Sequence, residues 1–143
     1  MGRPSDGDVL ARAGAGSAGR VLVRDDLGRV CVAVVDTNGD EAFVVAVVLH
    51  LDDDGVWRES EWNSAAVLGR GWLDGVAYAY GRTASASTVR IGVGDAVRQV
   101  PVNGPGWWCF MAEAPQSERL DLTAVPHPFP DAPPDQGPPR IAG

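Results

Sequence analysis

The chain has 143 residues, of which 45% are hydrophobic, and this size and composition predict one globular domain with its own core. The formal net charge of -7 at pH 7 argues against a nucleic-acid partner, because proteins that bind phosphate backbones do so with clustered basic side chains. The 12 basic residues are all arginine, which excludes chemistry that needs a lysine, such as Schiff-base catalysis.

Residues 1–19 are mostly small and polar, and they contain no apolar run of the kind that a signal peptide has. We predict that they form a flexible arm that contributes nothing to the core. The longest apolar run, residues 42–51, is too short to span a membrane. From these two features we expect a cytoplasmic protein with no membrane partner.

Short apolar runs alternate with turn sequences between residues 20 and 125, which predicts a single antiparallel β domain over this range. Asn38-Gly39 separates two of these runs and is a strong hairpin signal, because a type I′ turn needs positive φ at both central residues. The predicted strands are 20–24, 29–36, 41–51, 56–60, 76–81, 88–93, 96–102, 107–113 and 119–125. About nine short strands indicate an all-β sandwich, and a small β-barrel is the alternative.

Two segments depart from this pattern. Residues 61–72 fit either a loop or a single helical turn, and no strand is predicted there. Residues 126–143 contain seven of the 11 prolines, and proline lacks the backbone N–H that a sheet ladder needs. We therefore predict a disordered, extended tail over residues 126–143.

Predicted strands alternate with tight turns between residues 81 and 110. The pattern is carried by Gly81-Arg82, Val89-Arg90-Ile91, Gly94-Asp95 and Val102-Asn103-Gly104-Pro105-Gly106-Trp107-Trp108-Cys109-Phe110. Over residues 76–125 this pattern resembles the immunoglobulin-like β-sandwich modules of uncharacterised actinobacterial proteins. The resemblance implies a fold, and it carries no functional residue to this chain.

The two cysteines, Cys31 and Cys109, both lie within apolar runs. Two buried free thiols that pack as small apolar side chains are the favoured interpretation. The alternative is a disulfide between two sheets of a sandwich.

No set of residues has the spacing of a known catalytic or metal site, so we predict no catalytic residue, no metal and no cofactor. Asp36, Asn38 and Asp40 have the spacing of calcium ligands, but the glycine and glutamate of an EF-hand loop are missing at the positions that follow. An ordinary turn explains these residues.

Tryptophan supplies the best candidate for a ligand site. Trp62, Arg70 and Trp72 lie close together in the irregular segment. Aromatic faces and an arginine fork together provide stacking and directional hydrogen bonds. We predict that Trp62, Arg70 and Trp72 bind a ligand if the protein has a ligand site, although packing in the core also explains tryptophans.

The predicted hairpin from Arg29 to Leu51 is apolar on both faces of both strands. In a two-layer sandwich the opposite sheet covers only one face of a strand, so the other face needs a different cover. We predict a two-fold homodimer through this hairpin, because such interfaces are the commonest symmetric solution. Residues 61–72 or a different protein are the alternative covers.

Two classes of function fit these observations. The first is a non-catalytic protein-interaction or structural module, which the sequence favours. The second is a small-molecule-binding barrel or sandwich, such as a carbohydrate-binding module or an enzyme without a recognisable motif, for example a cyclase or isomerase. A solidly packed sandwich favours the first class, and an open lumen lined by tryptophan, tyrosine and arginine favours the second.

Overall fold

A computed structural model of the chain describes residues 3–66, 68–83, 88–103, 106–115 and 119–122. Within these ranges it contains one helix and ten strands, and the strands form three antiparallel sheets, none of which closes into a barrel. The prediction of an antiparallel all-β sandwich is therefore confirmed.

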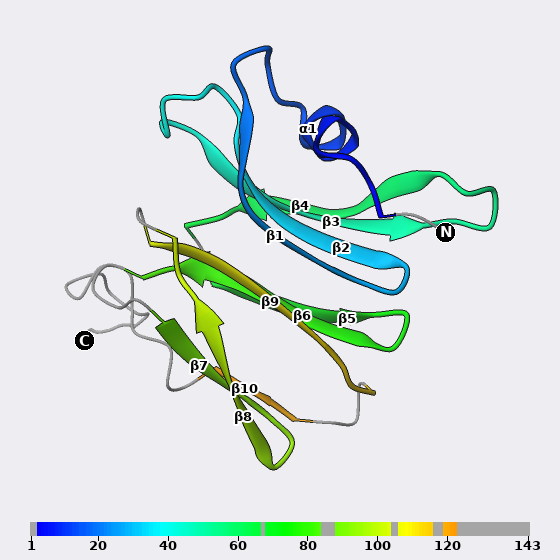
Figure 1. Ribbon diagram of the computed structural model, residues 1–143, viewed down its shortest axis with the longest axis vertical. Helices are drawn as coiled ribbons and strands as arrows, with labels where there is room; N and C mark the ends of the chain where they lie inside the picture. Colours follow the sequence, from blue (N-terminus) through cyan, green and yellow to red (C-terminus); the bar gives the residue numbers. More distant parts are fainter. Residues whose placement is uncertain (1–2, 67, 84–87, 104–105, 116–118, 123–143) are drawn as a thin grey trace, which may run out of the picture.

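The three sheets stack on one another, and the helix covers the outer face of the first (Figure 1). Sheet A contains β1 (Arg20–Leu27), β2 (Val30–Asp36), β3 (Val44–Leu51) and β4 (Trp57–Ser64), in that order. Sheet B contains β5 (Gly69–Leu73), β6 (Val76–Arg82) and β9 (Trp107–Glu113), with β6 in the middle. Sheet C contains β10 (Leu120–Asp121), β7 (Thr88–Val93) and β8 (Ala96–Pro101), with β7 in the middle.

Each gap between layers holds a separate apolar core, because successive residues of a strand point to opposite faces. The core between the helix and sheet A contains Val9, Ala13, Cys31, Ala33, Val35, Val45, Val47, Leu49, Leu51 and Trp57. The core between sheets A and B contains Val30, Val32, Val34, Val44, Ala46, Val48, Ala65, Val76, Tyr78, Tyr80, Trp107, Cys109 and Met111. The core between sheets B and C contains Ala77, Ala79, Val89, Ile91, Val93, Val100, Trp108, Phe110, Ala112, Ala114 and Leu120.

The prediction of a flexible arm over residues 1–19 is wrong, because residues Asp6–Ala13 form the helix α1. The helix begins with a capping box, in which Ser5 Oγ accepts the Asp8 N–H at 3.0 Å and Asp8 Oδ2 accepts the Ser5 N–H at 3.2 Å. It ends at Gly14, which has the left-handed φ of 74°. Val9 and Ala13 are 0% and 3% exposed, so the segment contributes to a core.

The helix also changes the argument for a homodimer. It covers the face of the β2–β3 hairpin that sheet B leaves open, and every residue of β2 is buried within the single chain. Neither a second copy nor residues 61–72 are needed for this burial. The single chain does not test the homodimer, but it removes the bare hairpin face from which the homodimer was predicted.

The hairpin itself has a wider turn than the sequence predicts. Asp36 pairs with Val44, so the connection spans residues 37–43 rather than Asn38-Gly39 alone. Gly39 does have a positive φ, of 83°. The Asp36 carboxylate accepts the N–H groups of both Gly39 and Glu41 at 3.0 Å, which holds the longer loop in shape.

The segment 61–72, predicted to lack strands, instead contains the end of β4 and most of β5. These are the edge strands of sheets A and B, and polar or small residues on their exposed sides hide the usual alternation. The predicted tail over residues 126–143 lies outside the described residues. No helix of the described chain has the length and apolar character needed to cross a bilayer.

Candidate functional site

The three residues of the predicted ligand site do not meet in one place. Trp62 lies on the α1 side of sheet A, where its Nε1 donates to the Ala13 carbonyl at 3.1 Å. Arg70 lies on the side of sheet B that faces sheet C, and its Nη1 donates to the carbonyl of Leu120 at 2.8 Å. Trp72 packs against the core between sheets B and C. Two sheets separate Trp62 from the other two side chains, so they form no common pocket.

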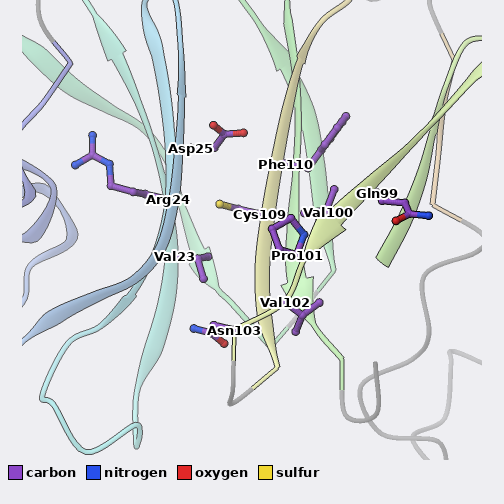
Figure 2. Close-up of a pocket in the computed structure, with 10 residues that line it drawn as sticks. All are labelled: Val23, Arg24, Asp25, Gln99, Val100, Pro101, Val102, Asn103, Cys109 and Phe110. Atoms are coloured by element: carbon purple, nitrogen blue, oxygen red, sulfur yellow. The ribbon is translucent and has the colours of Figure 1, made fainter. Parts of the chain in front are cut away.

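A different site lies at one edge of the stacked sheets, between β1, β8 and β9 (Figure 2). It is a groove of about 440 Å³, within the range of roughly 300–1,000 Å³ that is usual for ligand sites. Its lining residues are Val23, Arg24, Asp25, Gln99, Val100, Pro101, Val102, Asn103, Cys109 and Phe110. We call it the edge groove, because β9 is the last strand of sheet B on this side.

The backbone of β9 alternates between pairing with β6 and facing the edge groove. The Thr83 N–H donates to the Gly106 carbonyl, and the Ala114 N–H donates to the Gly75 carbonyl, so even-numbered residues of β9 face β6. The odd-numbered residues therefore turn their N–H and C=O groups outward. Cys109 lies between Trp107 and Met111 in this outward-facing set.

Two polar side chains cover the ends of this outward edge. At one end Asn103 accepts the Trp107 N–H through Oδ1 at 2.9 Å and donates through Nδ2 to the Leu22 carbonyl of β1 at 3.3 Å. At the other end the Asp25 carboxylate accepts the Met111 N–H. Trp107 and Met111 are four residues apart, which corresponds to about 13 Å of extended chain.

Between these ends the backbone N–H and C=O of Cys109 have no hydrogen-bond partner among the described residues. Such a pair of free backbone groups on a strand edge is what an added extended segment uses for pairing. The edge groove therefore combines apolar walls with an open stretch of backbone.

Asp25 gives the edge groove its charge. It lies on the sheet B side of β1, opposite Val32, whereas Arg24 lies on the α1 side. Figure 2 shows Arg24 pointing away from the groove. Partial burial of the Asp25 carboxyl is the main cause that raises its pKa above the ordinary value, and the hydrogen bond from the Asp26 N–H opposes this rise.

Cys109 contributes packing and backbone rather than reactivity. Its Sγ lies 3.9 Å from the Val32 carbonyl in the core between sheets A and B, and burial raises the pKa of its thiol. Cys31 lies in the core on the other side of sheet A, so the two sulfurs are not bonded and both cysteines are free. The interpretation as two buried free thiols is confirmed.

A second polar cluster, which we call the tyrosine clamp, joins the edges of sheets A and B. The Tyr78 and Tyr80 hydroxyls each donate to the Glu61 carboxylate at 2.5 Å. The tyrosine rings cross β5 over two glycines: a Cβ added to Gly71 would lie 2.4 Å from the Tyr78 hydroxyl oxygen, and one added to Gly69 would lie 2.2 Å from the Tyr80 ring. The clamp is internally satisfied, so it stabilises the contact between sheets rather than offering free groups.

The sequence predicts neither site, for two different reasons. In the tyrosine clamp, Gly69 and Gly71 alternate in step with Tyr80 and Tyr78, which is a signal for cross-strand pairing that sequence reasoning could have used. The edge groove has no such signal, because it depends on how β1 and β8 lie against β9. The described residues contain no group of three or more histidine, cysteine, aspartate or glutamate side chains able to hold a metal ion.

Comparison with protein families, with curated proteins and with solved structures finds no match for this chain.

Proposed function

We propose that this chain is a non-catalytic interaction module that binds an extended segment of a partner protein in the edge groove. The observation that carries this proposal is the unpaired backbone of Cys109, which lies between the two covered ends of the β9 edge. An extended segment can satisfy both backbone groups at once, and its side chains can contact the apolar walls.

The packing of the interior supports an interaction module over an enclosed ligand site. The tryptophan and tyrosine side chains of sheet B are used to fill cores or to make the tyrosine clamp. No sheet of the described chain closes around a lumen. The resemblance of residues 76–125 to immunoglobulin-like modules concerns the fold alone and stays a prediction.

The groove can be tested by filling it. Val102 lines the groove directly after the end of β8. Val97 lies within β8, is 58% exposed and is not among the residues that line the groove, so it serves as the control position. A library of displayed random peptides is selected against the wild-type chain, and the selected peptides are then tested on Val102→Trp and Val97→Trp. We expect Val102→Trp to lose binding by at least about tenfold and Val97→Trp to keep it.

The amide resonances of Cys109 and Met111 provide the second measurement, because a docked strand should shift both and should protect the Cys109 N–H from exchange. Selected peptides that bind Val102→Trp as well as the wild type, or that leave these two amides unchanged, would contradict the proposal. That result would favour a different surface, such as the exposed ring pair of Phe43 and Trp62, whose centroids lie 5.8 Å apart.

A further inference from the structure

The edge groove contains one carboxylate whose charge no cation of the described chain balances. Asp25 accepts hydrogen bonds from the N–H groups of Asp26 and Met111, and it forms no ion pair among the described residues. Asp25 is an exposed residue, but its carboxyl lines the groove without a cation from the described residues, and the desolvation that raises its pKa penalises the charged form. A ligand that brings a positive charge would relieve this cost.

The arginine nearest in sequence does not supply that charge. Arg24 donates to Asp26 at 2.6 Å, to Asp6 at 2.8 Å and to the Pro4 carbonyl at 2.8 Å, all on the α1 side of sheet A. Figure 2 shows the Arg24 and Asp25 side chains on opposite sides of β1. Arg24 therefore holds the helix in place, and its charge is already used there.

The surroundings of Asp25 fit a long side chain with a charged end. Val23 lies two residues before Asp25 on the same face of β1, about 7 Å along the strand. Val100 and Phe110 line the groove across from β1 and form an apolar wall there. The methylene stem of an arginine or lysine can pack along such a surface while its charged end reaches a carboxylate.

We propose that the segment held in the edge groove carries an arginine or lysine side chain, which packs along Val23 and forms an ion pair with Asp25. This inference rests on the proposed function and names the specificity of the same site. The net charge of -7 also favours encounter with a basic partner over an acidic one.

The test compares two peptides that differ only in charge. One is acetyl-Ala-Val-Arg-Val-Ala-amide, and the other has citrulline in place of arginine, which keeps the length and shape of the side chain but replaces one nitrogen with an oxygen and removes the charge. Both are titrated into the isotope-labelled chain while the amide resonances of Asp25, Cys109 and Met111 are followed. We expect the arginine peptide to bind about five-fold more tightly than the citrulline peptide.

Matched variants assign the effect to Asp25. Asp25→Asn keeps an oxygen that can accept the Met111 N–H, and we expect it to bind both peptides alike. Asp54→Asn removes one charge from an exposed turn residue whose side chain makes no contact among the described residues, and it should behave as the wild type. n-Butylguanidinium alone serves as the small-molecule arm, and it should shift Asp25 without shifting Cys109.

Three results would overturn the inference. They are equal binding of the two peptides, a preference for arginine that survives Asp25→Asn, and no saturable shift with either peptide up to about 10 mM. If the two peptides bind equally and Val102→Trp abolishes both, the groove still holds extended segments and only the charge preference fails. If neither binds, the peptide selection described above shows separately whether the groove takes any segment.

Discussion

At the scale of single residues, the tyrosine clamp shows how a polar cluster can join two sheets without forming a site. Glu61 lies on the edge strand of sheet A, and its carboxylate accepts both tyrosine hydroxyls of sheet B. Asn63 adds a hydrogen bond to Tyr80 at 3.1 Å. Because each partner is satisfied, the cluster avoids the cost of buried polar groups without partners.

This arrangement makes a prediction about alkaline pH. Burial and the hydrogen bond to Glu61 raise the pKa of Tyr80 to about 12, and the same causes raise the pKa of Tyr78 further. A raised folded-state pKa means that the stabilisation is complete below pH 10 and is lost as the pH rises from 10 to about 12. The chain has two tyrosines, so tyrosinate absorbance reports only this cluster.

The measurement is a spectrophotometric titration of the folded protein near 295 nm. We expect little tyrosinate at pH 10.5 in the wild type, and a midpoint shifted towards pH 10 in Glu61→Gln, where the negative charge is absent. Glu59→Gln, on the same strand outside the clamp, is the control and should titrate as the wild type. A wild-type midpoint near pH 10 would show that the hydroxyls are not held by Glu61.

At the scale of elements, the exposed strand edges differ in how they are protected. In β8, Pro101 lacks a ladder N–H, and Arg98 takes the position opposite the inward-facing Ile91. Both features discourage the addition of another strand. On β9 the side chains of Asn103 and Asp25 cover two positions, and Cys109 between them is left open. This open position on β9 distinguishes the edge groove from the edge of β8.

The docking of α1 is the second feature at this scale, and it can be tested with one substitution. Val9→Asp places a carboxylate at a fully buried position, and we expect the free energy of unfolding to fall by about 3 kcal/mol. Ala11→Asp, at an exposed position of the same helix, is the matched control and should change stability by less than about 0.5 kcal/mol. Urea denaturation followed by tryptophan fluorescence measures both.

If Val9→Asp and Ala11→Asp had the same small effect, the helix would not be part of the cooperative unit. The same substitutions report on Trp62, because its indole N–H is bonded to the last residue of the helix. Release of α1 should therefore red-shift the emission of Trp62 before global unfolding.

The elements differ in how well the sequence predicts them. The strands of sheet A from residue 20 to 60 follow from apolar runs and turn residues, and the structure places strands there. The helix α1 is only eight residues long and buries only Val9 and Ala13, so its apolar period is too short to recognise. β5 was missed because its two glycines serve the tyrosine rings of a neighbouring strand, which is a tertiary reason.

The candidate site could not be predicted for a related reason. Asp25 and Asn103 are single polar residues at strand and turn positions, and each has an ordinary local explanation in the sequence. Their roles arise because β1 and the end of β8 approach the same edge of β9 from different sheets. The predicted cluster of Trp62, Arg70 and Trp72 does not form, because these residues are close in sequence but lie in different layers of the fold.

At the scale of the whole molecule, the oligomeric state shows whether the β2–β3 hairpin is buried within one chain or between two chains. Because α1 and sheet B bury both of its faces, we expect a monomer of 15.0 kDa in light scattering at micromolar concentration. Val9→Asp, which frees one face, should associate with increasing concentration. A wild-type particle of twice the monomer mass would instead support the homodimer predicted from the sequence, and the dimer would then have to displace α1 or use another surface.

The order of the strands along the chain has a consequence for biosynthesis. Sheet A and α1 come from residues 6–64, so the ribosome releases all of them before any strand of sheet B. The last strand of sheet B, β9, follows β7 and β8, so the nascent chain cannot finish its middle layer until most of the outer one has been made. Throughout that interval the inner face of sheet A lacks the cover that Trp107, Cys109 and Met111 of β9 later provide, and chaperones that bind apolar surface have a long opportunity to engage it. Rare codons between residues 64 and 113 should therefore lower the soluble yield more than rare codons near the start of the chain.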